Sequence, residues 1–221
     1  MAINIAVVSY KGGVAKTTTA VHLAAYIRIV LEKYPLLIDG DLNQSALDWY
    51  QIGEHTKKRF PFPVTDEDMF NRLMANPATE KQWNKQYDYF IWDTPARPTE
   101  EELADLAKAD FFLVPVTPDP LAIRATYKMI DDLKKLQPDS NAKLPMVAII
   151  TKCPPKPSTV GTEAAKALQE EEIHVLPCAI PRLTAFEKAA LDGCLVQKLP
   201  GKYSKAGWAA YVKAFDALDF S

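Results

Sequence analysis

The chain has few of the residues that bind metals or form disulfides. Its 221 residues include only three cysteines, Cys153, Cys178 and Cys194, and three histidines. The cysteines are odd in number and match no metal-binding spacing, so we expect small buried side chains in a reducing compartment. The histidines show no ligand spacing either, and we expect them to play no catalytic part.

The chain also lacks an excess of one charge and any long apolar run. A net charge of −2 and a pI near 6.0 argue against a protein that coats nucleic acid by bulk charge, although a local basic patch stays possible. No apolar stretch approaches the ~18 residues that span a bilayer. Lys11 and two glycines interrupt the first apolar run, which disfavours a signal peptide. We therefore expect a soluble, cytoplasmic protein.

Short apolar runs alternate with amphipathic stretches along the whole chain. Near-continuous apolar strands are typical of a parallel sheet that is covered on both faces. With 48% hydrophobic residues and no repeat or linker, we expect a single α/β domain over 1–221, built on a doubly wound, mostly parallel sheet with helices on both faces. The expected strands are 3–8, 35–38, 87–92, 111–116 and 146–150, and the expected helices are 18–31, 45–51, 66–74, 100–107, 121–136 and 159–170.

The segment 7–18, VVSYKGGVAKTT, combines a strand end, a Gly-rich turn and a helix start. Such a turn forms an anion site, because backbone N–H groups and the helix dipole point at the ligand. Gly12 and Gly13 allow close approach of an oxygen, Lys16 suits β- and γ-phosphates, and Thr17 has the hydroxyl expected on Mg²⁺. We expect ATP and Mg²⁺ as the bound species.

The segment departs from the standard phosphate loop, G-x-x-x-x-G-K-[ST], in two places. Tyr10 replaces the first glycine, and Ala15 precedes the lysine. The pattern K-G-G-x-x-K-[ST] resembles instead the deviant Walker A box of the ParA/MinD ATPases. The resemblance implies that Lys16 serves the chain's own nucleotide, whereas Lys11 reaches the nucleotide of a partner copy across an ATP-sandwich dimer. It also implies nucleotide contacts from the whole box: Lys11, Gly12, Gly13, Val14, Ala15, Lys16, Thr17 and Thr18.

Two acidic segments fit the same family. LLIDGDLNQ resembles the family's Asp-x-Asp signature, except that Leu-Asn-Gln replaces the usual Pro-Gln, and YFIWDTP resembles its Walker B strand. By this resemblance Asp41 orients or activates the attacking water. Asp39 and Asp93 join Thr17 in the Mg²⁺ site. The resemblance thus implies a Mg²⁺-dependent ATPase with Lys11, Lys16 and Asp41 as its catalytic residues.

Two later segments are similar to the base-binding part of the family. Thr151, Lys152 and Pro154 follow the last apolar strand, where relatives place residues on adenine. Pro181 is the second residue of the segment 180–193, which resembles the closing loop and helix of short ParA proteins. The resemblance covers about residues 1–195.

The family resemblance implies an ATP-timed positioning protein. ATP binding would form a homodimer that binds nucleoid DNA without sequence preference, and a ParB-like or McdB-like adaptor would stimulate hydrolysis. The cargo would be a plasmid or a protein assembly; carboxysome-positioning proteins of the McdA kind are one candidate class, although these often lack the lysine that Lys11 supplies. We therefore expect a cytoplasmic, nucleoid-associated ATPase.

Three alternatives stay open. A MinD-like ATPase would act on a membrane through a basic amphipathic C-terminal helix. The C-terminal helical pattern has an apolar stripe from Trp208 to Leu218 but few cations, which favours packing on its own domain. A nitrogenase-iron-protein-like reductase would need cluster-binding cysteines on the loops that follow Asp93, and Cys153, Cys178 and Cys194 do not lie there; a small kinase would not need Lys11.

The DNA-binding surface is the least constrained expectation. The window LVQKLPGKYSKAGW, 195–208, is the most basic stretch without acidic residues. We expect its lysines to contact DNA phosphates: Lys198, Lys202 and Lys205.

Overall fold

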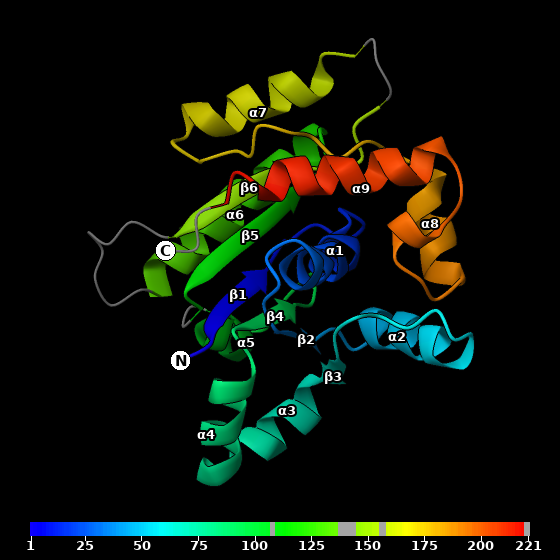
Figure 1. The fold of residues 1–221 in the computed structure, drawn as a ribbon. Helices are drawn as coiled ribbons and strands as arrows, with labels where there is room; N and C mark the ends of the chain where they lie inside the picture. The colour runs from blue at the N-terminus through cyan, green and yellow to red at the C-terminus, as the bar shows by residue number, and fades with distance from the viewer. Residues whose placement is uncertain (107–108, 137–144, 155–157, 219–221) are drawn as a thin grey trace.

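The computed structural model describes residues 1–106, 109–136, 145–154 and 158–218. Its strands form one six-stranded sheet in the order β3-β2-β4-β1-β5-β6, and every neighbouring pair is parallel (Figure 1). The strands are β1 (Ile3–Val7), β2 (Pro35–Asp39), β3 (Val64–Asp66), β4 (Tyr89–Asp93), β5 (Phe111–Val116) and β6 (Met146–Ile150). The expected α/β fold with a mostly parallel sheet is confirmed.

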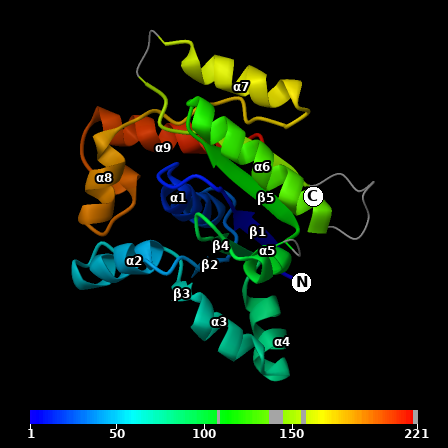
Figure 2. The ribbon, with the colours of Figure 1, turned by 180° about the vertical axis from the view of Figure 1, so that it is seen from behind.

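Helices cover both faces of this sheet. Figure 1 shows α1 and α9 on one face, and Figure 2, from behind, shows α5 and α6 on the other. The described helices are α1 (Lys16–Ile29), α2 (Ser45–His55), α3 (Glu67–Met74), α4 (Pro77–Gln86), α5 (Glu100–Leu106), α6 (Pro120–Leu136), α7 (Val160–Glu170), α8 (Thr184–Leu191), the 3₁₀ turn η1 (Val196–Lys198) and α9 (Lys202–Phe215).

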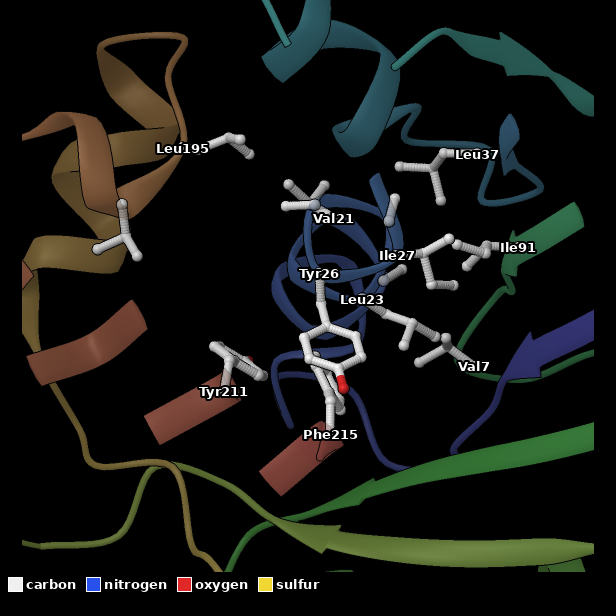
Figure 3. Packing of buried hydrophobic residues seen from close by; sticks show 14 of the residues in the cluster. Val7, Val21, Leu23, Tyr26, Ile27, Leu37, Ile91, Leu195, Tyr211 and Phe215 are labelled. Atoms are coloured by element: carbon white, nitrogen blue, oxygen red, sulfur yellow. The ribbon is translucent and has the colours of Figure 1, made fainter. Parts of the chain in front are cut away.

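Alternate residues of each strand face opposite sides of the sheet, and the buried side chains form three clusters. Along β1, Ile5 and Val7 pack with α1, α2, α8 and α9, whereas Ala6 packs with α5, α6 and α7. This period of two is the strand repeat, and both sets are apolar because neither face meets water. Figure 3 shows the first core, where Val7 and Leu37 lie around α1.

The carboxyl ends of three neighbouring strands carry aspartates in register. Asp39 of β2 pairs with both Asp66 of β3 and Asp93 of β4, and Asp93 pairs with Val7 of β1. Parallel strands place these ends on one edge of the sheet, where ligands bind in open α/β folds. The loop that joins β1 to α1 leaves from the same edge.

Two elements were not expected from the sequence. Strand β3 has only three residues, too few to show a periodicity, and it follows a Pro-rich stretch. Helix α4 buries no residue completely, so its sequence has little apolar pattern. Of the cysteines, Cys194 is buried as expected, but Cys153 and Cys178 are only half-buried.

The C-terminal helix α9 packs on the domain through its apolar stripe, as the sequence predicts. Tyr211 and Phe215 are fully buried, and Trp208 packs partly buried against the same core. Tyr26 of α1 donates a hydrogen bond to Asp216 at 2.9 Å. In the part of the chain that the structure describes, no helix has both the length and the apolar character needed to cross a membrane.

Candidate functional site

The Gly-rich turn between β1 and α1 needs left-handed backbone at two positions. Gly13 has φ of 77° and Ala15 has φ of 67°, directly before α1 begins at Lys16. A non-glycine residue in this region costs about 1 kcal/mol. Ala15 therefore occupies a position that favours glycine, which explains why the standard phosphate loop has glycine before its lysine. The backbone nevertheless adopts the turn that an anion site requires.

Two threonine hydroxyls bind this loop and the end of the strand that precedes it. Thr151, at the end of β6, donates to the Val14 carbonyl at 2.9 Å, and Thr94, after β4, donates to the Val7 carbonyl at 2.9 Å. Both threonines are buried, so each bond forms away from water. The Thr151 side chain is completely buried and its hydroxyl is engaged by the loop; a contact of this residue with a base stays a prediction.

Lys16, Asp39 and Asp93 are the buried ionisable groups of the site. The Lys16 side chain is 8% exposed and Asp93 is 0% exposed. Burial raises the pKa of Asp93 to about 7, against the opposing effects of the Lys16 charge and the Thr17 hydroxyl. Neither Asp93 oxygen has a hydrogen-bond partner of normal geometry within the described residues. A buried carboxylate without a partner is costly, so this edge of the sheet is built for a group that the protein itself does not supply.

The other two registered aspartates have partners. Asp66 accepts the Met69 N–H at the start of α3, at 2.7 Å. Asp39 accepts N–H groups of Ala46 and Leu47, at 2.8 and 2.9 Å, and thereby holds the start of α2. Its pKa is raised by burial, although these hydrogen bonds act in the opposite direction.

Asp41 lies in the loop between β2 and α2. It is half-buried, and its carboxylate accepts the backbone and side-chain N–H groups of Asn43 at 3.0 and 2.8 Å. Its backbone N–H donates to Asp39 at 3.2 Å, which ties the two acidic residues together. The charges of Asp39 and Asp41 both raise the pKa of Asp93 further, so the three carboxylates share one site.

These residues fit a magnesium ion that is bound together with a nucleotide. Among the described residues there is no group of three or more His, Cys, Asp or Glu side chains that could enclose a metal alone. Mg²⁺ is commonly held by one or two carboxylates, a hydroxyl, waters and substrate phosphates. The Thr17 hydroxyl and the unpaired Asp93 carboxylate are donors of this kind, with Asp39 beside them. The metal roles of Thr17, Asp39 and Asp93 stay predictions.

The remaining residues of the box lie around this point. Lys11 is half-buried, and Gly12 and Gly13 are exposed. The Thr18 backbone carbonyl accepts a hydrogen bond from Nδ1 of His22 at 2.7 Å. The Thr117 hydroxyl lowers the pKa of Asp119, and the charge of Lys11 adds to this effect. The charge of Lys11 therefore lies near Asp119, which directly precedes α6.

The structure brings the expected base contacts together at the end of β6. The backbone N–H of Cys153 donates to the Ile180 carbonyl at 3.0 Å, and the Cys153 carbonyl accepts the backbone N–H of Arg182 at 2.8 Å. This pairing places Lys152 and Pro154 next to Pro181, and Lys152 and Pro154 are exposed. Whether they contact a base stays a prediction.

The expected DNA-binding lysines form one exposed segment on the C-terminal part of the chain. Lys198 ends η1, whereas Lys202 and Lys205 lie in the first turns of α9. All three are exposed, and none forms an ion pair among the described residues. Cations at a helix N-terminus are not favoured by the helix dipole, so an anion at this place would be stabilising. Their DNA-binding role stays a prediction.

Comparison with known proteins agrees with this geometry. The family model "CobQ/CobB/MinD/ParA nucleotide binding domain" matches residues 5–196. Among curated proteins, the chain is 28% identical over 218 residues to the maintenance of carboxysome distribution protein A of Gloeobacter kilaueensis, covering 97% of this chain and 93% of that protein.

Two solved structures share the fold. The structure of apo McdA from Cyanthece has a TM-score of 0.74 at 16% identity and covers 97% of this chain and 100% of that one. The septum site-determining protein MinD of Pyrococcus horikoshii, complexed with Mg-ADP, has a TM-score of 0.71 at 18% identity and covers 100% of this chain and 97% of that one. At these identities the likeness shows the fold alone. The match of the family model to most of the chain shows more: the chain belongs to the CobQ/CobB/MinD/ParA family of nucleotide-binding domains.

Proposed function

We propose that this protein is a Mg²⁺-dependent ATPase that positions a cargo in the cell. ATP brings two copies together, the dimer binds DNA without sequence preference, and an adaptor protein triggers hydrolysis and release. Residues 1–221 act as one domain in this scheme, in the cytoplasm and on the nucleoid. The relative from Gloeobacter kilaueensis, which is named for carboxysome distribution, supports a protein assembly as the cargo.

The observation that carries the ATPase proposal is the Asp93 carboxylate. It is completely buried, has no hydrogen-bond partner among the described residues, and lies close enough to Lys16 and Thr17 for both to affect its pKa. A structural role does not explain it, because a buried carboxylate without a partner destabilises the fold. A phosphate-bound cation held beside Lys16 and Thr17 supplies the missing partner.

In this proposal each residue of the site has a separate role in nucleotide binding or hydrolysis. The N–H groups of the turn 11–18 and the Lys16 ammonium bind the phosphates, and Lys16 offsets charge that develops on the transferred phosphoryl group. Asp41 orients the attacking water through its carboxylate, which Asn43 now holds. When bound, Mg²⁺ stabilises the charge on the phosphate oxygens. Lys11 acts on the nucleotide of the second copy.

The matrix is DNA in this proposal, and a membrane is the second candidate. The apolar stripe of α9, which a membrane-binding helix would need, is already buried through Tyr211 and Phe215. The exposed segment that precedes this stripe carries Lys198, Lys202 and Lys205 without acidic neighbours in the first turn of α9. These two observations support DNA over lipid.

The test measures binding of the purified chain to a non-specific DNA duplex and to anionic liposomes, each with ATP, ADP or no nucleotide. DNA binding should require ATP and weaken steeply with salt, by ~0.9 log unit of affinity per log unit of salt for each phosphate contacted. Replacing Lys198, Lys202 and Lys205 with alanine should weaken DNA binding and reduce that slope.

A matched control replaces three exposed lysines elsewhere, Lys33, Lys57 and Lys81, with alanine. This variant keeps the same net charge as the test variant, so it separates a local surface from bulk charge. If both triple variants lose DNA affinity equally, the C-terminal segment is not the DNA surface. ATP-dependent liposome binding without DNA binding would support the membrane candidate instead.

A further inference from the structure

A cavity of about 660 Å³ lies on the sheet between helices α3 and α5. Its floor includes Asn4 and Ala6 of β1 and Trp92 of β4. At the carboxyl edge of the sheet the cavity reaches Gly40 and Asp93. Figure 2 shows α5 on this face of the sheet, with α3 below it. The volume is typical of a site for a small molecule.

The walls of this cavity are acidic throughout. Among the described residues that line it there is no lysine or arginine, whereas six carboxylates do so: Glu67, Asp68, Asp93, Glu101, Glu102 and Asp105. Glu67, Glu101 and Glu102 form no ion pair within the described part of the chain. Burial raises the pKa of Glu67, and the charge of Glu102, followed by those of two further carboxylates of the cavity, raises it more. A cleft lined by one sign of charge concentrates ions of the opposite sign, so this cavity attracts cations.

Asp93 gives a second, independent indication of a cation. It belongs to the wall of the cavity, is 0% exposed, and neither of its oxygens has a hydrogen-bond partner of normal geometry among the described residues. Such a charge is costly unless a partner comes from outside the chain. Mg²⁺ supplies that partner only together with a nucleotide, so the nucleotide-free chain leaves the charge open to another cation.

The shape and lining of the cavity favour an organic amine over a metal ion. Among the described residues, no group of three or more His, Cys, Asp or Glu side chains could hold a metal ion, so the carboxylates are spread along the cavity. The floor runs from Asn4 to the level of Val7, which pairs with Asp93, a length of about 10 Å at ~3.3 Å per residue. An extended aliphatic amine spans this length and brings each ammonium group near a different carboxylate. The half-buried indole of Trp92 in the floor also attracts ammonium groups and accommodates methylenes.

We propose that this cavity binds an aliphatic polyamine, with its ammonium groups between the carboxylates of α3 and α5 and its methylene chain on Trp92. Glu67 belongs to the α3 wall and Glu102 to the α5 wall, so one bound amine links the two helices. Binding neutralises carboxylates that repel one another and therefore stabilises the nucleotide-free chain. It needs neither ATP nor a second copy, and so it is separate from the function proposed above.

The experiment titrates spermidine into the full, nucleotide-free chain in EDTA at constant ionic strength, by isothermal titration calorimetry. Spermidine should bind at one saturable site, and an uncharged diol of similar length should not bind. Glu67→Gln and Glu102→Gln should each weaken binding about fivefold, as expected for the loss of one partly exposed ion pair. Both variants should fold, because glutamine has nearly the same shape and can still accept the Thr99 N–H that Glu102 accepts at 2.6 Å. Glu170→Gln removes the same charge from an exposed position of α7, outside the cavity, and should leave the affinity unchanged.

Other results would reject the polyamine site. Equal affinity in the parent, Glu67→Gln and Glu102→Gln would show that the cavity does not hold the amine. An equal loss in Glu170→Gln would reduce the effect to the net charge of the chain. Displacement of spermidine by Mg²⁺ at equal concentration would identify a general cation site, and tighter binding of a tetralysine peptide would replace the small amine by a basic segment of a protein. Because no nucleotide is present, these outcomes are independent of whether the chain hydrolyses ATP.

Discussion

Replacing Asp93 with asparagine should stabilise the nucleotide-free protein at neutral and higher pH. The folded protein raises the pKa of Asp93 from an ordinary value of 3.8 to about 7. The folded state therefore holds this proton more tightly than the unfolded chain does. Between these two pKa values the unfolded state binds fewer protons, so the stability of the parent falls as pH rises through this range.

The size of the effect follows from the same two values. A pKa that is higher by about three units corresponds to ~4 kcal/mol of destabilisation when Asp93 is ionised. Asparagine removes the charge but leaves an amide in a site with no hydrogen-bond partner among the described residues, at a cost of ~1–3 kcal/mol. We expect Asp93→Asn to be more stable than the parent by ~1–3 kcal/mol at pH 8, and to have no advantage at pH 4.

Urea unfolding in EDTA, without nucleotide, measures this difference at both pH values. With Mg²⁺ and ATP at pH 8 the order should reverse, because binding adds stability only to the parent. An advantage of the variant that is equal at pH 4 and pH 8, or a variant less stable than the parent at pH 8, would show that Asp93 carries no unpaired charge in the fold.

Four further predictions concern helix α1 and the loops at the carboxyl edge of the sheet. Lys16→Ala should abolish ATP binding in calorimetry, because the phosphates lose their cation; tight binding would reject the phosphate-loop role. Asp41→Ala should bind ATP and accumulate as a dimer by size exclusion while hydrolysing slowly; hydrolysis at the parental rate would remove it from the mechanism. Thr151→Val should weaken ATP binding about tenfold, because an unpaired buried carbonyl costs ~1–3 kcal/mol; unchanged affinity would show that the loop needs no anchor. Burial lowers the pKa of His22 from 6.5 to about 4. The parent should therefore lose up to ~3 kcal/mol of stability relative to His22→Phe as the pH falls from 6.5 to 4, and parallel pH profiles of the two proteins would contradict this.

Much of the fold can be predicted from local sequence patterns. Five of the six strands are apolar runs, since a strand covered on both faces admits little else. The helix α1 and its phosphate loop are also local, because glycines, a lysine and a threonine at fixed spacing act within a few residues of one another. Two elements without a strong sequence pattern were not predicted: strand β3 has only three residues, and helix α4 has no completely buried residue.

The roles of individual side chains depend on neighbours that are remote in sequence. Asp39, Asp66 and Asp93 look alike as acidic residues at strand ends, yet only Asp93 lies without a hydrogen-bond partner in the described structure. The difference arises because α2 and α3 begin directly beside Asp39 and Asp66, whose carboxylates accept their first N–H groups. Likewise, only the position of β6 in the sheet brings Thr151 under Val14.

The sequence alone therefore determined the type of each main element and the chemistry of the phosphate loop, because both depend on short-range spacing. The order of the strands, the pairing of Asp39 with Asp93, and the cavity between α3 and α5 were decided only by tertiary structure. These features join residues up to more than a hundred positions apart, such as Asn4 and Ala109 in the cavity, and packing of the two faces against one sheet is what brings them together.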